Sequence, residues 1–317
     1  MNDISVFSGS AHPAFATEIC SILGVELLPA HIVRFSNDCL QVQLRANCRQ
    51  QDVYIVQPLV PPVQDHLVEL LLMLDAARGA SAAQITAVIP HYAYARSDKK
   101  DAPRISIGGR LVADLLTTAG ASRVLTMTLH TPQVHGFFSV PVDHLTAIAE
   151  LAEHFRSRDL TNTVVVSPDL GNAKAASQLA RLLDLQVAAG SKQRLADDWV
   201  VIDAIVGDVD GKNVIILDDE IATGGSIIEL LKRLRERNVQ HISLACTHGL
   251  FTAAALERLS AADLDEILTT NTVPLAPEKR LPNLVVRSVA PLFAEAIRRI
   301  HLGESVSSLF SNVSTHA

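Results

Sequence analysis

Two adjacent aspartates and a glycine turn stand close together in the run Asn213-Val-Ile-Ile-Leu-Asp-Asp-Glu-Ile-Ala-Thr-Gly-Gly-Ser226. A glycine turn that opens a helix aims free backbone N–H groups and the positive end of the helix dipole at one point, where a phosphate fits. Asp218 and Asp219 could accept hydrogen bonds from vicinal sugar hydroxyls, or hold a metal through water. The run therefore predicts a sugar-phosphate site, and an ordinary strand-loop-helix with surface acids is the alternative.

The elements that would position this run follow from hydrophobic periodicity. Val214 to Leu217 form a continuous apolar run, typical of a strand buried on both faces of a parallel sheet, and apolar residues recur at helical spacing from Ile227. Five more strands are predicted at 53–57, 85–89, 124–129, 163–167 and 242–246, and helices at 67–78, 108–119, 173–183 and 227–237. This alternation predicts an α/β fold with mostly parallel strands, duplicated in the two halves of the chain.

Composition is compatible with a globular enzyme. The 317 residues are 48% hydrophobic and 19% charged, so a substantial core is available. The net charge of −7 argues against a general nucleic-acid surface, and an anionic ligand must then be met by local cations. The four cysteines lack C-x-x-C spacing, which argues against disulfides and structural zinc. Neither a signal peptide nor a membrane span is predicted, so we expect a cytoplasmic protein.

Further motifs occur in an order that is typical of one enzyme family. They lie at residues 7–10, 34–36, 88–100, 129–138, 167–169 and 294–299. With the carboxylate and glycine run they give a chain that resembles the ribose-phosphate pyrophosphokinases, or phosphoribosyl pyrophosphate synthetases, almost end to end. The resemblance implies two tandem phosphoribosyltransferase-like domains, 1–147 with an ATP flap and 148–295 with the ribose 5-phosphate and catalytic loops. Residues 296–317 would return to the first domain.

The resemblance also implies a reaction and a set of partners. The pyrophosphoryl group of ATP would move to the anomeric hydroxyl of ribose 5-phosphate, giving phosphoribosyl pyrophosphate and AMP for nucleotide biosynthesis. Magnesium would be the cofactor, and the enzyme would assemble as a homo-oligomer, a hexamer in the family. Attack at the β-phosphorus needs its negative charge neutralised, so catalysis should rest on magnesium and positioned cations.

The resemblance assigns roles to individual residues. Lys192 would stabilise the transition state with Arg194 beside it, in a segment where we expect a mobile loop; taken alone, a K-x-R pair is usually solvated surface. Phe35 would stack on adenine opposite Arg96, although by type alone it could equally be core. The other implied contacts with ATP are Asn37, Asp38, Cys39, Ser97, Lys99 and Lys100. Those with ribose 5-phosphate are Arg194, Asp218, Asp219, Ala222, Thr223, Gly224, Gly225 and Ser226.

His130 and Asp169 are the magnesium candidates. A carboxylate such as Asp169 is a natural magnesium ligand, whereas a strand-end imidazole such as His130 is more often a structural group. Arg49, Arg104 and Ser308 lie in segments that resemble the family's phosphate and ADP regulatory site. Sensitivity to these two ligands is therefore a hypothesis.

Four departures from the family pattern mark a divergent member. Asn37-Asp38-Cys39 replaces D-G-E, Thr128 replaces an acid before Leu-His, Ala222 replaces an acid before T-G-G, and Asn172 replaces a glycine. The changes at Thr128, at Asn37 to Cys39 and at Ala222 leave open a catalytically weak regulatory paralogue. A phosphoribosyltransferase that consumes the product is a third possibility, but it would not need an ATP flap.

Overall fold

The chain divides into two units, each with its own sheet. The computed structural model describes residues 4–196 and 199–310, with the backbone alone for 192–196, 199–203 and 310. One unit comprises Met1–Thr146, Thr272–Pro274 and Val289–Ala317, and the other Ala147–Asn271 and Leu275–Ser288.

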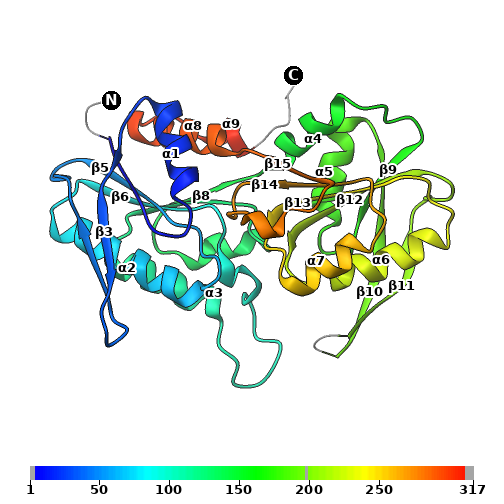
Figure 1. Ribbon diagram of the computed structural model, residues 1–317, viewed down its shortest axis with the longest axis horizontal. Helices are drawn as coiled ribbons and strands as arrows, with labels where there is room; N and C mark the ends of the chain where they lie inside the picture. The colour runs from blue at the N-terminus through cyan, green and yellow to red at the C-terminus, as the bar shows by residue number, and fades with distance from the viewer. Residues whose placement is uncertain (1–3, 197–198, 311–317) are drawn as a thin grey trace. The chain divides into compact units, whose positions relative to one another are not determined.

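The first unit is built on a parallel sheet with the strand order β2-β1-β5-β6-β7-β8. Its elements are β1 (Ile4–Ser8), α1 (Pro13–Leu23), β2 (Leu27–Leu28), β3 (Ala30–Arg34), β4 (Leu40–Leu44), β5 (Asp52–Val56), α2 (Val63–Gly79), β6 (Gln84–Ile89), η1 (Ala93–Arg96), α3 (Gly108–Ala119), β7 (Arg123–Met127), η2 (Pro132–Phe137), β8 (Val142–Leu145), α8 (Ala290–Leu302) and α9 (Ser307–Phe310). β3 and β4 pair only with each other, as an antiparallel hairpin. Helices α2 and α3 cover one face of the sheet, and α1 and α8 cover the other (Figure 1).

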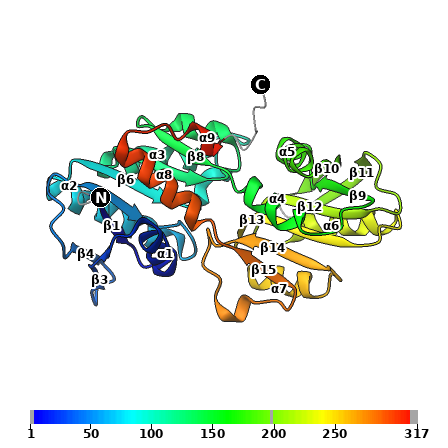
Figure 2. The same ribbon diagram turned by 90° about the horizontal axis from the view of Figure 1, so that it is seen from above.

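The second unit is built on a larger sheet with the order β11-β10-β9-β12-β13-β14-β15. Its elements are α4 (Ile148–Arg156), β9 (Thr163–Ser167), α5 (Ala173–Leu183), β10 (Gln186–Ala196), β11 (Trp199–Val206), β12 (Asn213–Ile221), α6 (Gly225–Arg235), β13 (Ile242–Gly249), α7 (Ala253–Ser260), β14 (Glu266–Thr270), η3 (Pro277–Lys279) and β15 (Leu284–Arg287). All of its strand pairs are parallel except β10–β11. The expected fold class is thereby confirmed, because both sheets are mostly parallel and flanked by helices (Figure 2).

Continuous apolar runs in the sequence correspond to strands that are buried on both faces. In β12, Val214 and Ile216 pack on the side of α6 and α7, whereas Ile215 and Leu217 pack on the side of α4 and α5. Successive side chains of a strand point to opposite faces, so every residue of such a strand needs to be apolar. Strand β12 continues to Ile221, beyond the predicted end at Leu217, because its backbone pairing with β13 extends through Ile221.

The C-terminal helix α8 is an integral layer of the first unit. Phe293 is fully buried and meets Phe15 of α1 edge to face, with ring centroids 5.4 Å apart. His301 Nδ1 lies 2.8 Å from Asp52 Oδ2 of β5, which fixes the far end of the helix against the sheet. Among the described residues, no helix is long and apolar enough to span a membrane.

Removal of the Phe293 ring should destabilise the first unit. We expect Phe293→Ala to lower the free energy of unfolding by about 3–5 kcal/mol, because the buried cavity between α8 and α1 would not collapse fully. Leu302→Ala on the same helix is the matched control, since Leu302 is 52% exposed and should cost no more than about 0.5 kcal/mol. Denaturant unfolding of both variants tests this, and equal losses would contradict the role given to α8.

Candidate active site

The two aspartates of the predicted sugar-phosphate run lie on β12 near its carboxyl end. Asp218 pairs in register with Cys246 of β13, and both aspartates are partly buried. The Asp219 backbone N–H donates to Asp218 Oδ1 over 2.9 Å. The two carboxylates are therefore held next to one another at the edge of the sheet where parallel α/β folds bind ligands.

Burial and like charge make Asp218 an unusual acid. Burial, followed by the neighbouring charge of Asp219, raises the pKa of Asp218 well above its ordinary value, and Asp169 adds to the shift. Burial also raises the pKa of the adjacent Cys246 thiol to about 12, so this cysteine stays protonated. The site thus presents concentrated negative potential, which hydroxyl donors or a cation would relieve.

Asp169 follows β9 and is connected to β12 through Asn172. The Asn172 backbone N–H donates to Asp169 Oδ1 over 3.0 Å, and Asn172 Nδ2 donates to the Leu217 carbonyl over 2.8 Å. A glycine, which the resemblance implies at this position, has no side chain to make the second bond. The departure at Asn172 therefore adds a direct tie between the Asp169 turn and the strand that carries Asp218.

The glycine loop has the backbone that an anion cradle requires. Gly224 has φ 72° and ψ 3°, a left-handed conformation, and α6 begins at the next residue. A Cβ on Gly224 would lie 3.8 Å from Ala255 of α7, so the loop rests on that helix. The predicted loop Ala222 to Ser226 is thus a turn at a helix N-terminus, as the sequence indicates.

The segment predicted as a mobile catalytic loop is a strand instead. Lys192 and Arg194 lie on β10, in register with Ile202 and Val200 of β11, and the ladder is irregular between Ser191 and Lys192. Their side chains lie outside the described residues. Antiparallel pairing with the β-branched run after Trp199 explains the strand, since that pattern favours a hairpin.

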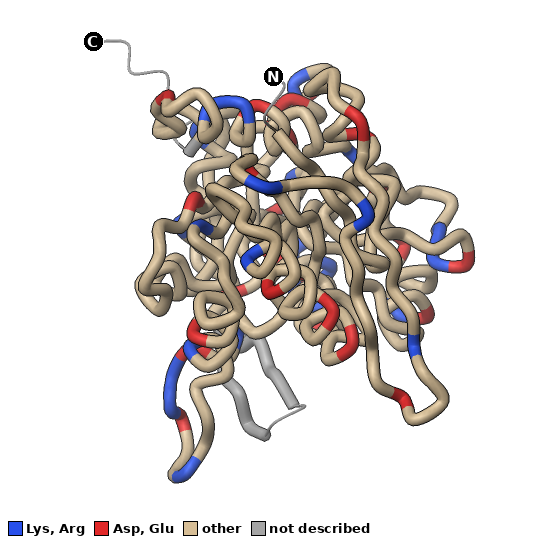
Figure 3. Tube along the Cα trace, turned by 90° about the vertical axis from the view of Figure 1, so that its left-hand side faces the viewer, with Lys and Arg blue, Asp and Glu red and all other residues tan. Residues whose placement is uncertain are grey.

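The nucleotide candidates belong to the first unit. Residues 97–107, which join η1 to α3, correspond to the predicted ATP flap and are called the flap below. Lys and Arg residues gather along this projecting segment, which includes Lys99, Lys100 and Arg104 (Figure 3, lower left). Ser97 closes its base, because Ser97 Oγ accepts the Gly108 N–H over 2.8 Å and donates to the Ser106 carbonyl. Arg96 precedes this closure and is exposed.

Phe35 lies at the tip of the β3–β4 hairpin and is not a core residue, since it is 47% exposed. The tip is a tight turn in which the Phe35 N–H donates to the Cys39 carbonyl, and Asp38 has φ 70°. The Cys39 N–H donates to Asn37 Oδ1. Asn37, Asp38 and Cys39 are all exposed beside Phe35.

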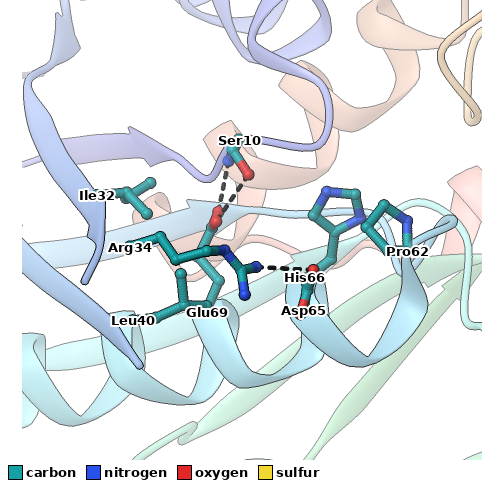
Figure 4. A pocket seen from close by; sticks show the side chains of 8 residues that line it. All are labelled: Ser10, Ile32, Arg34, Leu40, Pro62, Asp65, His66 and Glu69. Carbon is teal, nitrogen blue, oxygen red and sulfur yellow. Dashed lines mark hydrogen bonds and ion pairs between the residues drawn. The ribbon is translucent and has the colours of Figure 1, made fainter. Parts of the chain in front are cut away.

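A cavity of about 280 Å³ lies behind this hairpin, between β3, β4 and α2. In Figure 4, Arg34 reaches across to Asp65, at 2.8 Å, and Ser10 points to Glu69. Arg34 also bonds Asp38 over 2.6 Å. Arg34 is thus paired with two carboxylates and ties the hairpin that carries Phe35 to α2, whereas Glu69 is bonded to the neutral residues Ser10 and Gln57.

His130 is exposed in the loop after β7. His144 of β8 holds this loop through a hydrogen bond. The Leu129 N–H donates to His144 Nε2 over 2.8 Å. Burial, then the nearby His135, lowers the pKa of His144 to about 4, so its Nε2 accepts hydrogen bonds at neutral pH. Thr131 Oγ1 donates to Asp98 Oδ2 over 2.8 Å, which connects this loop to the flap.

The regulatory candidates all lie in the first unit. Arg49 Nη1 contacts Ser81 Oγ over 3.3 Å, Arg104 has φ 63° in the exposed flap, and Ser308 Oγ accepts a bond of 2.6 Å from Arg299. No group of three or more His, Cys, Asp or Glu side chains within the described part of the chain could hold a metal by itself. Asn172 and His144 are positioning residues that sequence reasoning missed; only the departure from glycine pointed to Asn172.

Comparison with known proteins covers nearly the whole chain. Residues 4–120 match the family described as the N-terminal domain of ribose phosphate pyrophosphokinase, and residues 201–311 match the phosphoribosyl synthetase-associated domain. A Streptomyces coelicolor protein provisionally named a ribose-phosphate pyrophosphokinase is 67% identical, over 98% of both chains. The Deinococcus radiodurans ribose-phosphate pyrophosphokinase is 52% identical, over 96% of this chain and 97% of that one. The crystal structure of phosphoribosylpyrophosphate synthetase from Mycobacterium smegmatis has a TM-score of 0.90 at 38% identity, covering 95% of this chain and 99% of that one.

The raised pKa of Asp218 predicts a cost in stability at neutral pH. The folded state holds the Asp218 proton more tightly than the unfolded state, so stability is lost as pH rises above the ordinary value of 3.8. We expect Asp218→Asn to melt a few degrees above the wild-type protein at pH 7.5 without ligands, at about 2–4 °C per kcal/mol relieved. The difference should shrink as pH falls towards 4.5.

Asp101→Asn serves as the control, because Asp101 is an exposed residue in the segment between η1 and α3, outside any helix or strand. Its melting temperature should stay close to that of the wild-type protein at both pH values. A lower melting temperature for Asp218→Asn at pH 7.5 would contradict the electrostatic strain assigned to the carboxylate pair.

Proposed function

Because the chain belongs to the ribose-phosphate pyrophosphokinase family, we propose that it transfers the pyrophosphoryl group of ATP to the anomeric hydroxyl of D-ribose 5-phosphate. The products are 5-phosphoribosyl 1-pyrophosphate and AMP. The observation that carries this proposal is the β12–α6 connection, where a pair of carboxylates adjoins a left-handed glycine at a helix N-terminus. One half of that connection suits sugar hydroxyls, and the other half suits a phosphate.

The residues of the second unit bind and orient ribose 5-phosphate. Asp218 and Asp219 accept hydrogen bonds from the ribose hydroxyls, which donate into the negative potential that raises the pKa of Asp218. Backbone N–H groups of Ala222 to Ser226 bind the 5-phosphate, so the acid that Ala222 replaces is not needed for this contact. The anomeric hydroxyl is thereby presented to ATP in a fixed orientation.

Positively charged side chains neutralise the pyrophosphoryl group during transfer. Lys192 stabilises the charge that develops in the transition state and Arg194 assists it, since phosphoryl-type transfer depends on positioned positive charge. Lys99 and Lys100 of the flap bind the triphosphate. Phe35 stacks on adenine with Arg96 on the other face; both side chains are exposed, as this role requires.

Asn37, Asp38, Cys39 and Ser97 support nucleotide binding through the two turns they build. The hairpin tip keeps Phe35 exposed, and Ser97 holds the two ends of the flap together. In this assignment the Cys39 thiol takes the place of the family's glutamate, so no carboxylate faces the nucleotide at that position.

Magnesium fits the donor set, with Asp169 as its carboxylate ligand and His130 as a further candidate. Asp169 supplies carboxylate oxygen, and magnesium is commonly held by one or two carboxylates together with waters and substrate phosphates. When bound, magnesium would neutralise negative charge on the phosphates of ATP. His144 keeps the His130 loop in place by accepting the Leu129 N–H.

Assembly and regulation complete the proposal. The enzyme forms a homo-oligomer, a hexamer as the family implies, and acts in the cytoplasm. Arg49, Arg104 and Ser308 bind phosphate or ADP as regulators; Ser308 is held by Arg299, which brings a further cation to that side chain. A rate that does not respond to added ADP or phosphate would overturn this regulatory assignment.

The proposal is tested by incubating the purified protein with ribose 5-phosphate, ATP and magnesium. We expect AMP and phosphoribosyl pyrophosphate to appear in equal amounts. If neither product appears, the result would favour the catalytically weak regulatory paralogue over the active enzyme. Pyrophosphate release from phosphoribosyl pyrophosphate and a free base, without ATP, would instead indicate a phosphoribosyltransferase.

Lys192→Ala tests the catalytic assignment. We expect turnover to fall by roughly 100-fold to 1,000-fold while the KM for ribose 5-phosphate changes little, because the Lys192 charge acts mainly in the transition state. Lys232→Ala, at an exposed lysine of α6 paired with Glu229, should retain normal kinetics. Lost sugar-phosphate affinity with turnover preserved would contradict this role for Lys192.

A further inference from the structure

Helix α7 and Thr252, the residue directly before it, hold two consecutive carbonyl groups of the loop that follows β12. The Thr252 backbone N–H and Thr252 Oγ1 both donate to the Ala222 carbonyl over 3.0 Å. Arg258 Nη1 donates to the next carbonyl, that of Thr223, over 2.8 Å. Both carbonyls of the loop are therefore turned toward α7.

Peptide geometry fixes the opposite side of the loop. In a planar trans peptide, the C=O of one residue and the N–H of the next point in opposite directions. Since the Ala222 and Thr223 carbonyls face α7, the N–H groups of Thr223 and Gly224 both point away from it. Successive N–H groups directed to one side, beside a left-handed residue, form a concavity that binds anions.

The Thr223–Gly224 peptide has an alternative orientation. Gly224, at φ 72° and ψ 3°, has the dihedrals of the third residue in a type II turn. A type I turn has nearly the same path but carries its central peptide flipped, and glycine adopts both. The flipped peptide would direct the Gly224 N–H away from the phosphate and turn its carbonyl oxygen toward it.

Arg258 is well placed to favour one orientation. Its side chain is exposed and, within the described part of the chain, has the Thr223 carbonyl as its only hydrogen-bond partner, with no carboxylate paired to it. Its helix face is fixed, since Ala255 and Leu259 beside it are buried and lie 3.8 and 4.0 Å from the Cβ position of Gly224. A guanidinium donor forms a charge-assisted bond, which is stronger than a bond between neutral groups.

We propose that Arg258 is a positioning residue for ribose 5-phosphate, which holds the Thr223–Gly224 peptide in the orientation that directs the Gly224 N–H at the phosphate. The proposal rests on the proposed function, because it takes this loop as the 5-phosphate cradle. Arg258 bonds the carbonyl side of the peptide, opposite the N–H side that faces the phosphate, and does not touch the phosphate. Its effect should therefore fall on sugar-phosphate affinity and leave ATP binding and the transition state largely unchanged.

The test measures ribose 5-phosphate binding by calorimetry without ATP, and the KM values of both substrates in turnover. Arg258→Met removes the donor and should weaken ribose 5-phosphate binding about tenfold, the effect of losing one charge-assisted bond. Arg258→Lys keeps a donor of similar length and should recover most of the affinity. The KM for ATP and the melting temperature should stay near the wild-type values in both variants.

Two controls separate positioning from simple loss of charge. Glu257→Gln/Arg258→Met restores the local net charge without restoring the hydrogen bond, so it should bind as weakly as Arg258→Met. Lys232→Gln removes one positive charge from α6 and should bind normally. Wild-type affinity in the double variant, or equal changes in both KM values for Arg258→Met, would overturn the proposal.

Failure of the proposed function is distinguishable from failure of this inference. A wild-type protein that binds ribose 5-phosphate but forms no product would contradict only the proposed reaction, since the binding comparison among variants would still decide the role of Arg258. A wild-type protein that does not bind ribose 5-phosphate would overturn both the cradle and the role of Arg258.

Discussion

Parallel pairing of β12 with β9 and β13 is the constraint on which the second unit's chemistry depends. It brings the carboxyl ends of three strands to one edge, so Asp169, Asp218 and the glycine loop converge although they are far apart in the sequence. The apolar residues on both faces of β12 hold this edge rigid, and the polar residues begin where that burial ends. The position of the site is therefore set by the point along β12 at which the buried core ends.

An anionic protein that binds an anionic substrate has to place acids for the sugar hydroxyls and an anion site for the phosphate within a few residues of each other. In the function we propose, the acids of β12 face the sugar hydroxyl groups, while the phosphate meets neutral backbone at the start of α6, where the helix dipole is positive. The concentration of carboxylates costs stability, as the raised pKa of Asp218 indicates. The fold tolerates this cost because β12 is paired on both sides, with β9 and β13, and these strands fix its position.

Sequence patterns identified the parts of the site that depend on local structure. The buried run 214–217, the turn at Gly224 and the helix after it are each encoded by a few neighbouring residues, and all are present. The ties that depend on tertiary packing were not predictable: Asn172 bonds the Leu217 carbonyl within another strand, and Arg258 bonds a carbonyl 35 positions away. The β10–β11 hairpin was missed because polar residues around Lys192 suggested a loop, whereas pairing with β11 decides its structure.

The position of α8 gives the chain an unusual order of completion during its synthesis. The second unit ends at Ser288, whereas the first unit requires the helix that follows. As the chain emerges from the ribosome, the first 146 residues appear first, yet the face of α1 around Phe15 stays uncovered until Phe293 is released. Domains fold as units while the chain grows. The second unit is therefore the first that can be complete, and the nascent first unit leaves an apolar face of α1 uncovered until α8 has been made.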